Sequence, residues 1–325
     1  MIRVHNRSAT FFPPTNATYL MGDFTDWDER PLPINGPLTL EFPEGAYVEY
    51  AFLDAQMRPL ADPQNPQQPK HAWYDYHRMF TLPHHRFQTP QRSAHWSGTI
   101  VTYDISSRFL EGTRTCYLYE PAVFPLATIY VQDGEAFYQN LALHLVADAL
   151  LERKEIKPVR IVFIEPQDRV AEYWFNQYYE NFLLEEVLPF IDQKHGPTKE
   201  RCLWGASLGG MVSAWLAWKH ADIFSLVVSQ SGCFTADPQG GNYYHDVEWL
   251  TTQFAQTERL PVRFYLETGQ IEWLLASNRR FAATMAEKGY RHSYQERPAG
   301  HNWATWEQGL VPALRYLFGE EKEAL

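Results

Sequence analysis

A serine on a glycine-flanked turn is the residue in this sequence best suited to chemistry. Ser207 lies in the run Trp204-Gly205-Ala206-Ser207-Leu208-Gly209-Gly210, after a short apolar segment and before an amphipathic one. A Gly-x-Ser-x-Gly turn between a strand and a helix projects the serine hydroxyl above a sheet, and its glycines leave room for neighbouring backbone. The context predicts that Ser207 is a nucleophile and that the Leu208 amide, at the helix start, donates to an oxyanion.

A serine alcohol attacks a carbonyl efficiently only when a base removes its proton, so this nucleophile requires a histidine. The chain contains 12 histidines, and His301 lies in the loop Pro298-Ala299-Gly300-His301-Asn302, between the last expected strand and the last expected helix. Folds that use this kind of serine turn place their histidine late in the chain. We therefore predict that His301 is the general base.

The histidine needs a carboxylate that orients its imidazole, and the loop after the next-to-last strand commonly supplies it. Here that loop is 268–273, and its Glu272 is the first choice. Glu267, at the end of the strand, is the next alternative, and Asp237 and Asp246, in the irregular stretch after residues 229–232, follow. The sequence leaves the choice between Glu272 and Glu267 open.

A second oxyanion donor is expected in the loop after the strand 127–132, where Gly134 lets the backbone approach a substrate. Further candidate substrate-binding residues are Glu135, Arg169, Asn176 and Trp273. The histidines outside this region lack the accompanying carboxylates of a metal site. We expect no metal and no other cofactor.

The elements that position these residues begin near residue 98. From there apolar strand-like runs alternate with amphipathic segments, a pattern typical of βαβ units. The strand runs are 99–103, 115–119, 128–132, 159–165, 201–204, 225–229, 262–267 and 293–296, and the expected helices lie near 136–151, 172–193, 208–220, 278–288 and 303–317. We predict an α/β fold with a doubly wound, mostly parallel sheet over residues 98–325.

The first 90 residues follow a different pattern. Short β-prone runs at 18–20, 38–42, 47–53 and 78–82 are separated by Pro, Gly and Asp clusters, without a helical period. We expect a small all-β sandwich domain over residues 1–90, followed by a linker.

Composition excludes several classes of partner. The formal net charge is -11 at pH 7, and no cluster of Lys and Arg is present, which argues against nucleic acid and anionic membranes. The N-terminus lacks the apolar run of a signal peptide, and no membrane-length apolar stretch follows. We expect a cytoplasmic protein that acts on a small-molecule ester; the sequence does not indicate its oligomeric state.

The cysteines are too few and too widely spaced for a disulfide framework, so we expect all three, Cys116, Cys202 and Cys233, to be buried.

Together these motifs resemble the enterochelin (ferric-enterobactin) esterase family of α/β-hydrolases. The resemblance rests on motifs in order along the chain: 61–66, 131–135, Arg169 followed by Asn176, 204–210, 229–232, 267–272 and 300–301. It implies an α/β-hydrolase fold preceded by an early-set, immunoglobulin-like sandwich, and a triad of Ser207, Glu272 and His301. It also implies that the chain cleaves a siderophore-like or related ester through an acyl-enzyme.

Two features set this sequence apart from that family. The N-terminal segment is shorter, and its run 22–27 resembles the sandwich of glucan-active enzymes. A ferric siderophore is a trianion, yet the expected region holds only scattered cations, Arg169, Arg279 and Arg280. The alternatives are therefore a feruloyl or acetyl esterase acting on carbohydrate esters and, in another class, a catalytically idle glycan-binding or scaffold protein.

Overall fold

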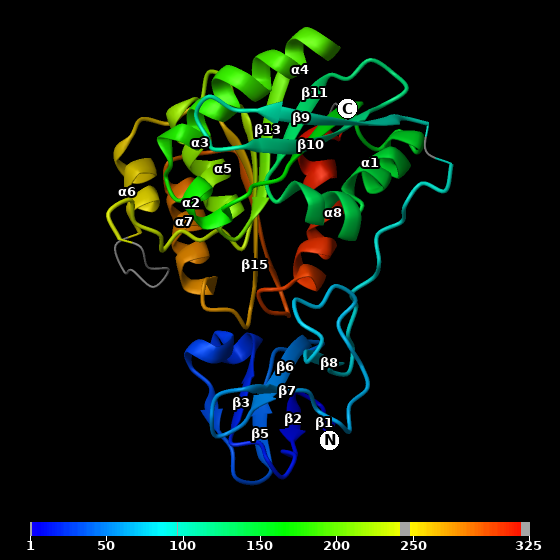
Figure 1. Ribbon diagram of the computed structural model, residues 1–325, viewed down its shortest axis with the longest axis vertical. Coiled ribbons are helices and arrows are strands. Elements are labelled where there is room, and N and C mark those ends of the chain that lie inside the picture. Colours follow the sequence, from blue (N-terminus) through cyan, green and yellow to red (C-terminus); the bar gives the residue numbers. More distant parts are fainter. Residues whose placement is uncertain (1, 96, 241–247, 320–325) are drawn as a thin grey trace. The chain divides into compact units, whose positions relative to one another are not determined.

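The computed structural model describes residues 2–95, 97–240 and 248–319 (Figure 1). The chain divides into two units. One comprises the chain up to Thr89 together with Glu267–Ala276 and Gln295–Gln308, and the other comprises Pro90–Leu266, Ser277–Tyr294 and the chain from Gly309 onward. The loop that contains Glu272 and the loop that contains His301 therefore pack in the same unit as the N-terminal strands.

The α/β part is built on an eight-stranded sheet with the order β16-β15-β14-β13-β11-β12-β10-β9. Its strands are β9 (Thr99–Ser106), β10 (Thr113–Glu120), β11 (Ala127–Val131), β12 (Val159–Ile164), β13 (Glu200–Ala206), β14 (Leu226–Gln230), β15 (Arg263–Gly269) and β16 (His292–Arg297). The central strand β11 pairs in parallel with β12 and β13, and β13 pairs in parallel with β14. At one edge β10 pairs antiparallel with β12 and β9. All eight predicted strand runs are present, which confirms the predicted α/β sheet.

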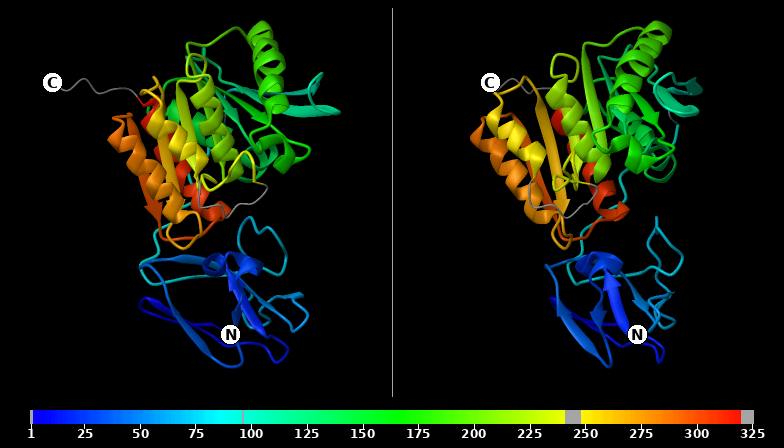
Figure 2. Two further views of the ribbon diagram at one scale, coloured as in Figure 1. Left: turned by 90° about the vertical axis from the view of Figure 1, so that its left-hand side faces the viewer. Right: turned by 60° about the vertical axis from the view of Figure 1, so that its left-hand side comes forward.

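Helices cover both faces of this sheet. The helices α1 (Leu143–Glu152) and α8 (Trp303–Phe318) lie on one face, and α5 (Leu208–Lys219), α6 (Trp249–Gln256) and α7 (Leu275–Glu287) lie on the other (Figures 1 and 2). Strands covered on both faces read as continuous apolar runs. Accordingly, every residue of β11, β12 and β14 is buried.

Two of the expected long helices are interrupted, and the prediction was wrong there. The segment 136–151 starts as a π-helical turn, η3 (Ala136–Asn140), and Ala142 with φ 50° separates it from α1. The segment 172–193 is divided into α2 (Arg169–Tyr173), α3 (Gln177–Asn181), the π-helical η4 (Phe182–Val187) and α4 (Leu188–His195). Phe175, with φ 50°, makes the break between α2 and α3. A single left-handed residue leaves the apolar period nearly unchanged, so periodicity did not reveal these breaks.

The N-terminal segment is all-β, as predicted, apart from two 3-10 turns (Figure 2). One sheet contains β1 (Ile2–His5), β2 (Ser8–Phe11) and β5 (Leu38–Glu41); the other contains β4 (Leu32–Pro33), β3 (Tyr19–Gly22), β6 (Tyr47–Leu53) and β7 (Pro59–Leu60), with β8 (Arg78–Thr81) also paired to β6. The turns η1 (Asp23–Thr25) and η2 (Trp27–Glu29) follow β3. Edge-to-face contacts join Phe11 to Phe42, Tyr50 and Phe80, at centroid distances of 5.2 to 6.5 Å, and form the core of this segment.

Three further expectations concern the cysteines, membrane-spanning helices and metal-binding groups. The three cysteines are buried, as predicted, and have free thiols. Within the described ranges no helix is long and apolar enough to cross a membrane. The same residues contain no group of three His, Cys, Asp or Glu side chains that could hold a metal. Asp246 lies outside the described residues.

Candidate active site

Ser207 makes the turn between β13 and α5 in a strained conformation. Its φ is 57° and its ψ is -122°, a region that non-glycine residues rarely adopt. The Ser207 amide donates to the carbonyl of Gln230 at 2.8 Å, and the Ser207 carbonyl accepts from the Met211 and Cys233 amides at 3.1 and 3.0 Å. These three hydrogen bonds hold the strained turn between α5 and the chain that continues from β14.

The glycine before the serine is required by close backbone packing. A Cβ atom on Gly205 would lie 2.3 Å from the backbone carbon and oxygen of Gly209. At Gly209 itself the nearest atoms to such a Cβ are side-chain atoms of Asp133 and Gln132, at 3.0 and 3.1 Å. The first glycine therefore allows α5 to start directly after β13, and the second fits against the neighbouring loop.

The two predicted oxyanion donors lie at the starts of helical segments. Leu208 is the first residue of α5, so its amide has no carbonyl partner within the helix. Gly134 packs on β12, because a Cβ there would lie 2.4 Å from the Ile164 nitrogen and 2.5 Å from the Phe163 carbonyl carbon. This packing alone requires a glycine, and it fixes the Gly134 backbone in place.

Arg169 braces the backbone around the serine. Its Nε and Nη2 donate to the two carboxylate oxygens of Asp133 at 2.6 and 3.0 Å, and its Nη2 also donates to the carbonyl of Ala206 at 3.2 Å. The guanidinium thus joins the loop before Gly134 to Ala206, the residue before Ser207. Its charge is already compensated by Asp133.

Two other predicted substrate-binding residues have structural partners. Asn176 caps α3, because its Oδ1 accepts from the Tyr178 amide at 2.7 Å while its Nδ2 donates to the Ala171 carbonyl at 2.7 Å. Glu135 is exposed and accepts from the Gln139 side chain at 2.7 Å. The structure therefore gives Asn176 a role in the break between α2 and α3.

Glu272 is the carboxylate that lies beside His301. Its Oε2 is 3.3 Å from His301 Nδ1, and its side chain is fully buried. The distance is that of an ion pair, although the ring N–H is not aligned for a hydrogen bond. The other oxygen, Oε1, accepts from Thr268 Oγ1 at 2.6 Å, which fixes the orientation of the carboxylate.

Glu267, the alternative acid, has a different partner. Its Oε2 accepts from Nε and Nη2 of Arg297 at 2.9 and 2.7 Å, and its side chain is fully buried. This is a fork-shaped ion pair between β15 and β16. It gives Glu267 a structural role.

Aromatic rings restrict the imidazole of His301. The ring centroids of Trp273 and His301 are 4.4 Å apart, and the two ring planes make an angle of 43°. The ring centroid of Trp306 lies 5.1 Å from that of His301, in an edge-on arrangement. The Trp273 Nε1 donor is buried and makes no hydrogen bond to any described residue. Trp273 therefore combines a packing role beside His301 with an unused donor.

Two polar neighbours of this site were missed by the sequence analysis. Thr268, which fixes Glu272, belongs to the expected loop but carries no signal of its own. Asp23 accepts from the Asn302 side chain at 3.0 Å, one residue beyond His301. Its only sequence signal is its place in the run 22–27, because long-range packing of this kind has no local pattern.

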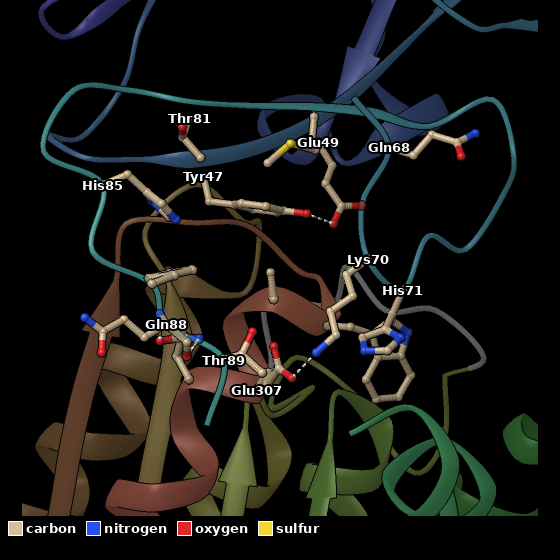
Figure 3. A pocket seen from close by; sticks show the side chains of 15 residues that line it. Tyr47, Glu49, Gln68, Lys70, His71, Thr81, His85, Gln88, Thr89 and Glu307 are labelled. Carbon is tan, nitrogen blue, oxygen red and sulfur yellow. Dashed lines mark hydrogen bonds and ion pairs between the residues drawn. The ribbon is translucent and has the colours of Figure 1, made fainter. Parts of the chain in front are cut away.

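A pocket of about 360 Å³ lies in the same unit (Figure 3). Tyr47 and Glu49 of β6 line it together with Trp303 and Glu307 of α8, and Lys70 pairs with Glu307 at 2.6 Å. The fifteen residues that line it do not include Ser207, Glu272 or His301. The pocket is therefore separate from the predicted reacting groups.

Comparisons with known proteins agree with the fold. A family model described as a putative esterase matches residues 107–317. The iron(III) salmochelin esterase of Escherichia coli O6:H1 is 25% identical over 248 residues, which cover 69% of this chain and 60% of that protein. The crystal structure of the enterobactin esterase FES from Shigella flexneri has a TM-score of 0.73 at 18% identity and covers 97% of this chain and 94% of its own. A ferulic acid esterase structure has a TM-score of 0.60 at 20% identity over 68% of this chain and 98% of its own.

These findings confirm the expected α/β-hydrolase fold with an all-β N-terminal segment, and the resemblance to enterochelin esterases. The FES likeness extends over both parts of the chain, whereas the ferulic acid esterase covers a smaller share. At these identities the structural matches establish the fold alone.

Proposed function

Because the chain belongs to the putative esterase family, we propose that this esterase uses Ser207 as its nucleophile and forms an acyl-enzyme. The observation that carries the proposal is the strained backbone of Ser207, with φ 57° between a buried strand and a helix. Strain of this kind persists where surrounding structure enforces it, and it is concentrated at functional sites. Family membership also argues against the idle scaffold.

In the first half-reaction His301 acts as the general base. Its Nε2 takes the proton of the Ser207 hydroxyl while Oγ bonds to the ester carbonyl carbon. The carbonyl π electrons move to oxygen, and the Leu208 and Gly134 amides stabilise the resulting oxyanion. When the tetrahedral intermediate collapses, the C–O bond to the alcohol breaks and the imidazolium returns its proton to the leaving oxygen.

In the second half-reaction water replaces the alcohol. His301 removes a proton from water as it adds to the acyl carbon, and Ser207 leaves with that proton. Glu272 stabilises the imidazolium in both steps and keeps the Nδ1 proton directed towards itself. The 3.3 Å separation between Glu272 and His301 and the Thr268 hydrogen bond support this role.

For the substrate we propose a siderophore-like or related ester with an aromatic acyl group. The similarity to the iron(III) salmochelin esterase supports it, as does the likeness to FES over 97% of this chain. Trp273, with a buried unused donor beside His301, could contact an aromatic or hydroxylated acyl group.

A feruloyl or acetyl ester is the second candidate, favoured by the charges of the site. Arg169 is compensated by Asp133, and Arg280 is paired with Glu248. Two of the three expected cations are thus engaged within the protein, which weakens the case for a trianionic ligand. The ferulic acid esterase likeness supports this alternative.

The proposal is tested with Ser207→Ala and with three esters. We expect wild-type turnover of p-nitrophenyl acetate and a loss of at least about 1000-fold in kcat for the variant, with an unchanged melting temperature. Full activity in Ser207→Ala would refute the nucleophile. Relative kcat/KM for ferric enterobactin and ethyl ferulate then decides between the two substrate classes.

A further inference from the structure

The loop that carries His301 is held by residues from the opposite end of the sequence. The Tyr47 amide at the start of β6 donates to the Pro298 carbonyl at 2.9 Å. Asp23, in the turn after β3, accepts from Asn302 Nδ2 at 3.0 Å. All four residues belong to one unit of the fold, so this contact network is internal to that unit. It fixes the loop on both sides of His301.

Asp23 fits this loop closely. Its side chain is buried, and its Oδ2 accepts from the Glu49 amide at 2.8 Å as well as from Asn302. A Cβ on Gly300 would lie only 2.1 to 2.4 Å from Asp23 side-chain atoms. The carboxyl group therefore packs directly against the backbone that precedes His301, and any side chain at position 300 would displace it.

Hydrogen bonds to Thr305 connect Gly300 and Asn302 to the first turn of α8. The Asn302 Oδ1 accepts from the Thr305 amide at 3.0 Å, and Thr305 Oγ1 donates to the Gly300 carbonyl at 2.6 Å. Gly300 and Asn302, the two neighbours of His301, are thus joined to each other through Thr305 and to Asp23. The backbone at His301 has little freedom to move.

We infer that Asp23 is a positioning residue for His301, which acts by holding the Gly300–Asn302 backbone so that the imidazole stays beside Glu272. The inference rests on the proposed role of His301 as general base. It assigns to the N-terminal segment a part in the chemical step. A misplacement of about 1 Å at a reacting group can lower a rate by about 100-fold.

The Asp23 carboxyl suits this role in its neutral form. Burial, and then the nearby Glu49 and Glu272 carboxylates, raise its pKa well above the ordinary range for aspartate. Its Oδ1 makes no hydrogen bond to any described residue. An asparagine is nearly isosteric with protonated aspartate and can accept both hydrogen bonds through its own Oδ1, so it provides a conservative variant.

The first test compares Asp23→Ala, Asp23→Asn and a matched control in the same segment. Asp62 is also buried and accepts from the Tyr50 hydroxyl, but its described hydrogen bonds lie within the N-terminal segment. With p-nitrophenyl acetate we expect Asp23→Ala to lower kcat by about 10-fold to 100-fold with KM within about twofold. Asp23→Asn should keep kcat within about threefold of wild type, and Asp62→Asn should lower only the melting temperature.

The second test removes the donor of the hydrogen bond to Asp23. Asn302→Asp keeps the acceptor for the Thr305 amide but removes the donor to Asp23. We expect a loss in kcat similar to that of Asp23→Ala.

A third measurement does not depend on activity. Hydrogen exchange followed by mass spectrometry should show faster exchange of amides 299–305 in Asp23→Ala than in wild type or Asp62→Asn. The inference is overturned if exchange of this loop is unchanged or if faster exchange leaves kcat unaltered. Full activity in His301→Ala would instead refute the proposed base, and the exchange result would still show whether Asp23 holds the loop.

Discussion

At the level of single residues, two carboxylates five positions apart have different partners. Glu272 contacts His301 and Thr268, and Glu267 pairs with Arg297. Both side chains are fully buried, so burial alone does not distinguish them. Their partners distinguish them. A carboxylate beside an imidazole controls which ring nitrogen carries the proton, whereas a carboxylate beside an arginine compensates a buried charge.

The substitution Glu272→Gln should abolish most activity without unfolding the protein. The Thr268 hydroxyl can still donate to the amide oxygen, which would direct the NH₂ group at His301 Nδ1. That donor favours the tautomer with its proton on Nε2, which cannot accept a proton from serine. We expect kcat to fall by about 10⁴-fold with a near-normal melting temperature.

Glu267→Gln serves as the matched control, since it leaves the Arg297 charge without its carboxylate partner. We expect the melting temperature to fall by several degrees and kcat to stay within about tenfold of wild type. If Glu267→Gln caused the larger catalytic loss, the acid would have to be reassigned.

Local signals led to the candidate residues that follow a fixed order along the chain. Ser207 is marked by its glycines, and His301 and Glu272 by their loops after β16 and β15. Asp23 and Thr268 could not be found in this way. Asp23 meets Asn302 across 279 positions of sequence, and such a contact depends on how whole segments pack. The partners of Arg169 and Asn176 were hidden for the same reason.

At the level of elements, the connection from β13 to α5 determines where Ser207 lies. The helix starts directly after the serine, and this is possible because the Gly205 and Gly209 backbones approach each other closely. The breaks at Ala142 and Phe175 show the opposite situation, in which a left-handed residue ends a helical segment without any glycine. Glycine patterns predicted the first connection and could not predict the others.

The substitution Gly205→Ala should prevent this connection from forming. The new methyl group would lie 2.3 Å from Gly209 backbone atoms, and backbone cannot move aside as a flexible side chain does. We expect a loss of more than about 3 kcal/mol in unfolding free energy, or insoluble protein. Gly36→Ala is the control, because a Cβ there has no atom within 4 Å, and it should change stability by less than about 0.5 kcal/mol. Equal stability of the two variants in urea denaturation would show that the close approach is not required.

At the level of the whole molecule, buried titratable groups make stability depend on pH in two directions. Burial raises the pKa of Glu49 to about 8, and burial lowers the pKa of His77 and His144 to about 4. The histidines contribute stability above their unfolded pKa near 6.5, which is lost as the pH falls towards 4. Glu49 contributes stability below its unfolded pKa near 4.5, which is lost as the pH rises towards 8. Stability should therefore be greatest in mildly acidic solution.

The substitution Glu49→Gln should flatten the alkaline side of this profile. Between pH 5 and pH 8 the wild type should lose at most about 1.4 kcal/mol of unfolding free energy per pH unit through Glu49, and the variant should not show this loss. Denaturation curves at pH 5, 6.5 and 8 measure the difference. The exposed Glu44 supplies the control variant Glu44→Gln, whose profile should match the wild type. A Glu49→Gln profile that is parallel to wild type would show that Glu49 is ionised in the folded protein.

Covalent labelling distinguishes a single activated serine from all other hydroxyl groups of the protein. The protein is treated with a fluorophosphonate, which reacts with a serine activated by a neighbouring base, and the adduct is located by peptide mass spectrometry. We expect one adduct, on Ser207, with loss of esterase activity in proportion to labelling and no adduct in His301→Ala. An adduct on another residue, or unlabelled protein that retains ester hydrolysis at saturating reagent, would contradict this expectation.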